Sequence, residues 1–137
     1  MRVFLDSSAL VKRYIGEPGS EKVVAWCDKA TELVVAVIAV PEVISSFCRL
    51  VREGRLTEQQ YAALKGDLRA DLADAILCDT SPQVVQRAIF ALEKHSLRAM
   101  DAIHLGAALV SRAEVFVSAD RRQCEAAKQL GVDVAAV

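Results

Sequence analysis

Four acidic residues that lie far apart in the chain stand where they could share one site. Asp6 and Asp120 each come at the end of an apolar run that predicts a strand, and Glu42 and Asp101 fall at the beginnings of predicted helices. In a parallel sheet the carboxyl ends of the strands share one edge, so acids remote in sequence can meet there. Clustered carboxylates repel one another unless a cation lies among them. The pattern therefore predicts a divalent-metal site and phosphate chemistry.

Each acid also has a simpler structural explanation. An Asp at a helix N-cap satisfies free N–H groups and interacts favourably with the helix dipole, which would explain Asp6 and Asp120 separately. An acid is equally ordinary in a first helical turn, the position of Glu42. Asp101 is harder to explain in this way, because its helix is almost wholly apolar and a buried carboxylate needs a cation, a hydrogen-bond network or a capping role. The joint placement at one edge favours the metal site.

Polar residues beside these acids could support them. Ser7 follows Asp6, and Ser118 offers a hydroxyl at the end of the strand before Asp120. His104 lies one helical turn from Asp101, and we interpret it as a packed histidine that is hydrogen-bonded to a neighbour rather than as a metal ligand. Asp79 is interpreted as part of a helix cap.

Basic side chains near the predicted edge could hold a phosphate backbone. The predicted substrate contacts are Lys12, Arg13, Arg49 and Arg121, and Arg52 and Arg122 lie near the same edge. Each of these side chains taken alone would be an ordinary solvated charge, so only the set supports nucleic-acid contact.

Strand and helix patterns alternate along the chain. Apolar runs predict strands at 3–5, 33–38, 75–78, 115–118 and 132–137. Apolar periodicity and capping signals predict helices at 8–14, 20–30, 41–53, 58–73, 82–94, 100–112 and 120–130. This alternation predicts an α/β fold with a mostly parallel sheet between layers of helices.

Buried faces can be assigned to three of these helices from their apolar spacing. The helix at 20–30 is expected to turn Val23, Val24 and Cys27 inward. The helix at 41–53 is expected to bury Val43, Ile44, Phe47, Leu50 and Val51. The helix at 82–94 is expected to bury Val85, Ala88, Ile89 and Leu92.

Composition limits the class of protein. The 137 residues are 53% hydrophobic with a net charge of −1, which predicts a single domain over 1–137 and no general basic field. The four cysteines are widely spaced, which favours reduced core residues over disulfides or a zinc site. We find no signal peptide and no apolar segment long enough to span a membrane, so we expect a soluble, cytoplasmic protein.

The segments VFLDSSALVKRY, AVPEVISSFCRL, MDAIHLGAAL and VFVSADRRQCEAAKQLGV resemble the four signature blocks of PIN-domain ribonucleases, in the family's order. The similarity covers essentially the whole chain and is greatest to the VapC-type toxins of toxin–antitoxin pairs. The chain departs from the family where Ser45 and Ser46 stand near a frequent Asn, and where Cys124 stands at a frequent aromatic position.

The resemblance implies a PIN-like three-layer α/β/α sandwich with a five-stranded sheet and a Mg²⁺ or Mn²⁺ site. By motif match Asp6, Glu42, Asp101 and Asp120 take the acidic positions, with Asp6, Asp101 and Asp120 as metal ligands, and Ser118 takes the hydroxyl position. The family cleaves RNA with metal-activated water. Its toxin members often form homodimers, and a small antitoxin inhibits them by placing a tail across the site.

We therefore predict a metal-dependent endoribonuclease, the toxin of a type II toxin–antitoxin pair. One alternative is a PIN nuclease acting in RNA processing, and another is a non-catalytic PIN-like binding module. A more remote alternative is a phospho-receiver-like domain that would use Asp79, although no lysine closely follows the strand at 115–118.

Overall fold

Five parallel strands form the centre of the computed structural model, which describes residues 1–137. The strands are β1 (Arg2–Leu5), β2 (Glu32–Ala36), β3 (Ile76–Cys78), β4 (Val115–Ser118) and β5 (Asp133–Ala136). Their order across the sheet is β3-β2-β1-β4-β5, and every neighbouring pair is parallel. The sequence predicted all five strands and a mostly parallel sheet, and the observed sheet is parallel throughout.

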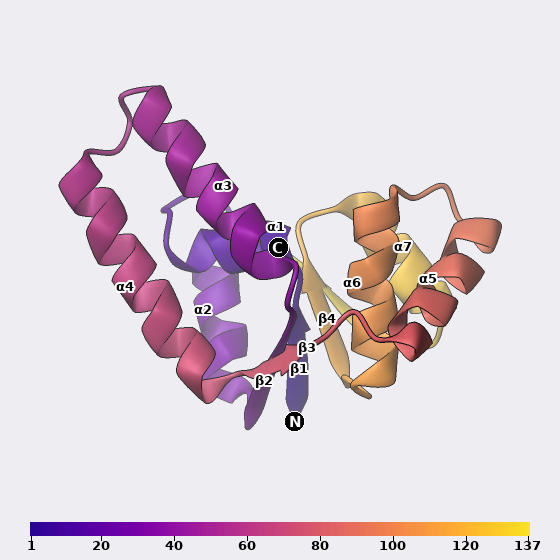
Figure 1. Cartoon of the computed structure of the whole chain (residues 1–137). Coiled ribbons are helices and arrows are strands. Elements are labelled where there is room, and N and C mark those ends of the chain that lie inside the picture. The colour runs from indigo at the N-terminus through magenta and orange to yellow at the C-terminus, as the bar shows by residue number, and fades with distance from the viewer.

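Helices cover both faces of this sheet (Figure 1). They are α1 (Ser7–Leu10), the 3₁₀ turn η1 (Val11–Arg13), α2 (Ser20–Lys29), α3 (Ala39–Arg52), α4 (Glu58–Asp74), α5 (Pro82–Lys94), α6 (Ala99–Val110) and α7 (Arg121–Gln129). Helices α1 to α4 gather on one side of the strands, and α5 to α7 gather on the other. The predicted three-layer α/β/α sandwich is therefore confirmed. No helix combines the length and the apolar character needed to cross a membrane.

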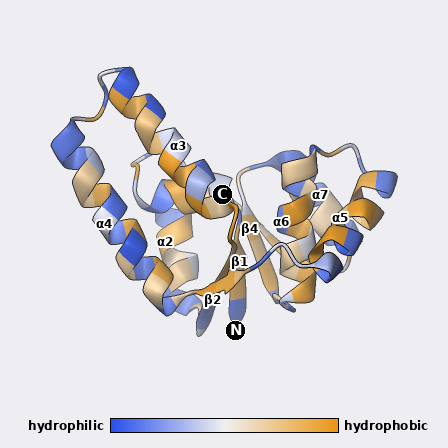
Figure 2. Cartoon of the chain, in the orientation of Figure 1, coloured by the Kyte–Doolittle hydropathy of each residue, from blue (hydrophilic) through white to orange (hydrophobic).

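The strands divide the core into two halves because successive side chains of a strand point to opposite faces. Val3 and Leu5 of β1 pack with Phe47 of α3 on one face. Phe4 packs with Phe116 and with Leu105 of α6 on the other. In Figure 2 the central strands carry the hydrophobic colour, and the outer helix α4 carries many hydrophilic residues. The sheet edge that holds the acids is thus supported from both sides by packed side chains.

Local capping signals set the beginnings of α4 and α5, although Ser81 rather than Asp79 caps α5. Thr57 and Gln60 form a reciprocal capping box at the start of α4. Ser81 caps α5 by accepting a hydrogen bond from the Val84 N–H at 3.3 Å, and Pro82 occupies the first helical position.

The predicted buried face of α5 is wrong except for Ala88. Val84, Ala88 and Ala91 are buried, whereas Val85, Ile89 and Leu92 are exposed. The reason is the close approach of α6, where a Cβ added at Gly106 would lie 2.5 Å from the Val84 carbonyl oxygen. The row of Val84, Ala88 and Ala91 faces α6, and Val85, Ile89 and Leu92 lie on the side of α5 that faces away from it.

The predicted inward face of α2 is partly wrong, because not all of its three residues face the core. Val23 is fully buried and Cys27 is partly buried in the same core half. Val24 is exposed, because the short helix presents only one row of side chains to the core.

Candidate active site

The ends of β1 and β4 bring Asp6 and Ser118 together. Leu5 pairs with Val117 in the parallel ladder, and the Asp6 N–H donates to the Val117 carbonyl oxygen at 3.2 Å. The Ser118 hydroxyl then donates to Oδ2 of Asp6 at 2.5 Å. Residues remote in sequence therefore meet at the carboxyl edge of the sheet, as the topology argument predicted.

Asp6 is both a helix cap and a buried carboxylate. Its side chain is fully buried, and Oδ1 accepts hydrogen bonds from the Ser8 hydroxyl at 2.6 Å and from the Ala9 N–H at 2.9 Å. Burial raises the pKa of Asp6, and the hydrogen bonds from Ser118 and Ser8 counteract that rise only in part. The capping explanation and the functional one thus apply to the same residue.

Asp120 and Asp101 face the same space from two helix beginnings. Asp120 caps α7, where Oδ1 accepts from the N–H groups of Arg122 at 2.8 Å and Gln123 at 3.1 Å. Asp101 lies in the first turn of α6, and its Oδ1 accepts from the Gln123 side-chain amide at 3.1 Å. Burial, and next the negative charge of Asp120, raise the pKa of Asp101. The two carboxylates are therefore close enough to repel each other.

A contact with a buried histidine on α6 connects Glu42 to the helix that carries Asp101. It lies in the first turn of α3 with its side chain about one-third exposed, and its Oε1 lies 2.7 Å from Nε2 of His104 on α6. His104 is buried against the edge of the Phe4 ring. The interpretation of His104 as a packed, hydrogen-bonded histidine is confirmed.

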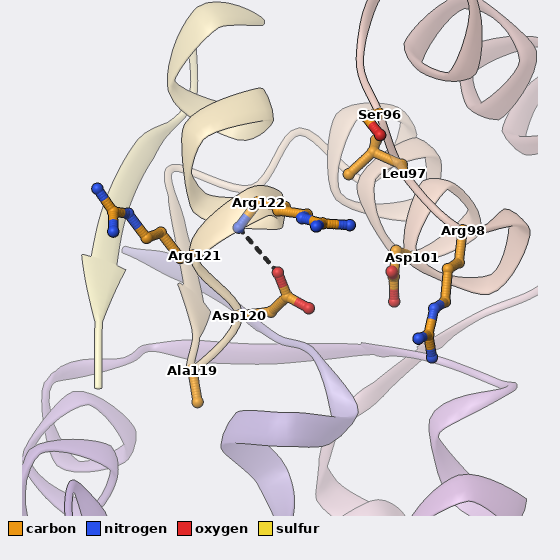
Figure 3. Close-up of a pocket in the computed structure, with 8 residues that line it drawn as sticks. All are labelled: Ser96, Leu97, Arg98, Asp101, Ala119, Asp120, Arg121 and Arg122. Carbon is orange, nitrogen blue, oxygen red and sulfur yellow. Dashed lines mark hydrogen bonds between the residues drawn. The ribbon is translucent and has the colours of Figure 1, made fainter.

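Two hollows open on either side of this edge. The first, about 540 Å³ in volume, is lined by Asp101 and Asp120 together with Arg98, Arg121 and Arg122. Figure 3 shows the side chains of Arg98 and Arg122 on opposite sides of the two carboxylates, whereas Arg121 is directed away from them. The second hollow is lined by Glu42 and by the serines Ser7, Ser8, Ser45 and Ser46.

The first hollow suits a hydrated divalent cation. Oδ2 of Asp120 accepts no hydrogen bond from the protein, and Figure 3 shows this free oxygen turned toward Asp101. The Asp101 carboxylate accepts from Gln123, and the Arg98 backbone N–H acts to lower its pKa. Mg²⁺ prefers oxygen ligands, keeps several waters and binds through one or two carboxylates. No group of three Asp, Glu, His or Cys side chains could hold an ion by itself. The donor set therefore fits an ion that keeps much of its water. Asp6, predicted from the sequence as a third ligand, lines neither hollow, and both its oxygens accept hydrogen bonds from the protein.

The predicted basic contacts differ in their surroundings. The Lys12 ammonium donates to the Pro18 carbonyl at 2.7 Å, and the Arg13 guanidinium is paired with Asp71 at 2.8 Å. Arg49 is exposed on α3. Arg121 is 91% exposed and lies 3.6 Å from Glu125. Of these four residues, only Arg121 lines the hollow that holds Asp101 and Asp120, and its contact with substrate stays a prediction.

Three polar residues at the site were not named from the sequence. Ser8, rather than its neighbour Ser7, supplies the hydroxyl that reaches Asp6. Gln123, three residues after Asp120, is buried and holds Asp101. Arg98 directly precedes α6 and lines the first hollow. Their positions within three residues of an acid, at helix beginnings, were the available sequence signal.

An all-parallel α/β sandwich with acidic side chains at the carboxyl edge of β1 and β4 defines the class of protein. The model of the PIN domain family matches residues 3–129, and the chain belongs to the PIN-domain family.

Individual relatives agree with this assignment. The chain is 32% identical to Ribonuclease VapC45 of Mycobacterium tuberculosis (strain CDC 1551 / Oshkosh), over 97% of this chain and 94% of the relative. The crystal structure of VapC20 of Mycobacterium tuberculosis, described as a Sarcin-Ricin loop cleaving toxin, is similar in fold, with a TM-score of 0.68 and 14% identity over 95% of each chain. A toxin-antitoxin complex from Klebsiella pneumoniae is also similar, with a TM-score of 0.66 and 16% identity over 88% of each chain.

Proposed function

We propose that this protein is a metal-dependent endoribonuclease and the toxin of a type II toxin–antitoxin pair. The observation that carries the proposal is the 32% identity, over nearly the full length of both chains, to a protein named a ribonuclease. The acids at one sheet edge support the same proposal, because burial and then the negative charge of Asp120 raise the pKa of Asp101. A PIN domain without catalysis would have no need to keep two carboxylates in one hollow.

Divalent metal dependence is general among PIN-domain ribonucleases, and we propose Mg²⁺ or Mn²⁺ here. A bound ion would lower the pKa of a coordinated water and stabilise the charge that develops on the phosphate. We assign Asp101 and Asp120, which line one hollow, to hold the ion, Asp120 through its free Oδ2 atom. Asp6 would support the edge of the sheet through its hydrogen bonds with Ser118 and Ser8, and Glu42, which lines the second hollow, would orient the attacking water.

Arginines around the first hollow supply the substrate contacts in this proposal. Arg98 and Arg122 lie on opposite sides of Asp101 and Asp120 (Figure 3), where guanidinium groups could bind the non-bridging phosphate oxygens of an RNA strand. Lys12 and Arg13 are already hydrogen-bonded to Pro18 and to Asp71, so recruiting them would mean breaking those contacts.

The partners that we propose are RNA, a cognate antitoxin and a second copy of the chain. The structural relative from Klebsiella pneumoniae is described as a toxin-antitoxin complex, which supports an antitoxin partner. The exposed apolar side chains Ile76, Leu77, Ile89 and Phe90 offer surface for such contacts. Sedimentation of the purified chain measures whether it is a dimer.

Cleavage of a structured RNA by the purified protein tests the proposed activity. We expect internal cuts in Mg²⁺ or Mn²⁺ that disappear with a chelator. Asp101→Asn should lower the single-turnover rate by at least about a hundredfold, the usual effect of removing an electrostatic contact to a transition state. Asp79→Asn is the matched control, since Asp79 is an exposed acid after β3 that lies outside both hollows.

Other outcomes distinguish the alternatives. Full activity of Asp101→Asn would contradict the assigned site. Absence of cleavage by the wild type, with equal Mn²⁺ binding by the wild type and by a variant with all four acids changed to amides, would favour a non-catalytic module. Cleavage without growth arrest on expression would favour a nuclease of RNA processing.

A further inference from the structure

The buried imidazole of His104 contacts Glu42 across two helices. His104 is 1% exposed, and its Nε2 lies 2.7 Å from Oε1 of Glu42. An ionised carboxylate only accepts hydrogen bonds, so the histidine must donate, and its hydrogen lies on Nε2. This geometry therefore places a hydrogen on Nε2.

The other ring nitrogen supports the same tautomer. Nδ1 of His104 is buried and has no hydrogen-bond partner. With a single hydrogen on Nε2, Nδ1 carries only a lone pair, and an under-satisfied acceptor is better tolerated than a buried N–H without an acceptor. Because Phe4 packs edge-on against the ring, the ring has a fixed orientation in which to donate.

Glu42 needs such a partner more than the other acids do. Asp6 and Asp120 are fixed by backbone N–H groups of their own helices, and Asp101 is held by Gln123. Glu42 has a longer side chain, is about one-third exposed and accepts no other hydrogen bond to its carboxylate. Without His104 this carboxylate would sample several rotamers in solvent.

We propose that His104 is a positioning residue that holds the Glu42 carboxylate in register with Asp101. His104 and Asp101 lie three residues apart on α6, on the same side of the helix, so one rigid helix carries one acid directly and orients another through its histidine. This inference rests on the proposed function, in which Glu42 orients the attacking water. His104 itself touches neither substrate nor ion.

Nitrogen NMR of the imidazole rings tests the geometry without any activity. The chain has two histidines, so a His95→Gln variant assigns the spectrum. We expect the Nε2–H tautomer for His104 in the metal-free wild type, and a mixture of tautomers in Glu42→Ala. A dominant Nδ1–H tautomer in the wild type would overturn the proposal, whether or not the protein cleaves RNA.

A kinetic cycle then tests the consequence for catalysis. His104→Leu should lower kcat by about 10- to 100-fold, the usual effect of losing an orienting partner, with little change in KM. His104→Gln can place an amide N–H near the position of Nε2 and should restore most of the rate. In a Glu42→Ala background, His104→Leu should cause no further loss. An equal loss in both backgrounds would mean that His104 acts only through packing, and it would overturn the proposal. Absence of cleavage by the wild type would contradict the proposed function and leave the NMR result to decide the inference.

Discussion

The Ser118 hydroxyl donates a hydrogen bond to Asp6 Oδ2 at 2.5 Å, although the two residues are 112 positions apart in the chain. The Ser118 hydroxyl oxygen in turn accepts from the Asp120 backbone N–H at 2.9 Å. One small side chain at the end of β4 thereby links the acid that follows β1 to the acid that begins α7.

Replacing this hydroxyl should destabilise the protein. Ser118→Ala leaves Oδ2 of the fully buried Asp6 without a donor, and we expect the free energy of unfolding to fall by about 1 to 3 kcal/mol. Urea denaturation without metal measures this change. Ser111→Ala is the control, since that hydroxyl contacts only the Ala108 carbonyl at the end of α6 and should change stability by less than about 0.5 kcal/mol. Equal effects of the two changes would contradict the assigned role of Ser118.

The Asp101 carboxylate should make the metal-free protein less stable as pH rises. Its pKa is raised in the folded state by burial and then by Asp120, so folding favours the protonated form. The associated stability is present below the unfolded pKa of about 3.9 and is lost as the pH rises through the folded value. Asp101→Asn cannot ionise, so its melting temperature in a chelator should exceed that of the wild type at pH 7 and converge with it near pH 3.5.

Two further measurements check the cause of this effect. Asp133→Asn changes an exposed acid on β5 and should shift the melting temperature by the same amount at pH 7 and near pH 3.5. Added Mg²⁺ or Mn²⁺ should raise the melting temperature of the wild type more than that of Asp101→Asn, because an ion that binds only the folded state stabilises it. If the melting temperatures of the wild type and Asp101→Asn differed by the same amount at all pH values, the explanation would be contradicted.

Close packing of α5 on α6 should make Gly106 intolerant of a side chain. A Cβ at this position would lie 2.5 Å from the Val84 carbonyl oxygen and 3.2 Å from the Ala88 nitrogen. Gly106→Ala should therefore lower the free energy of unfolding by about 1 to 3 kcal/mol. Gly66→Ala in α4 meets no atom within 4 Å and should raise it by about 0.5 to 1 kcal/mol. Chemical denaturation of the pair measures both, and a stabilising Gly106→Ala would contradict the observed packing.

Local signals were sufficient to predict the frame of the site. Short apolar runs ending in Asp6 and Ser118 identify strands whose ends carry polar groups, and the parallel topology requires those ends to share an edge. The prediction that His104 is a packed, hydrogen-bonded residue followed from its apolar helix. Each of these conclusions depends on neighbours in sequence or on the general geometry of parallel sheets.

Details that depend on contacts between distant elements could not be predicted. The choice between Ser7 and Ser8 at Asp6 depends on how α1 turns after β1. Gln123 reaches Asp101 only because α6 and α7 lie side by side at the sheet edge. Which face of α5 is exposed depends on the close approach of α6 at Gly106, and the sequence pattern within α5 does not predict that contact.

The arginines around Asp101 and Asp120 should control RNA binding. Arg98→Gln and Arg122→Gln each remove a charge that lines the hollow, and each should weaken binding by about tenfold, since a hydrogen bond to a charged group contributes about 1.5 kcal/mol or more. The double change should also reduce the slope of log affinity against log salt by about 1.4 for a single strand. Fluorescence anisotropy in a chelator, which should prevent cleavage, measures both quantities. Arg87→Gln, on the exposed side of α5, is the control and should have little effect on RNA binding. Arg121→Gln should weaken binding less than Arg98→Gln or Arg122→Gln, because the Arg121 side chain is directed away from the two carboxylates (Figure 3). If Arg87→Gln weakened binding as much as Arg98→Gln, RNA would be held by general charge and the hollow would lose its assigned role.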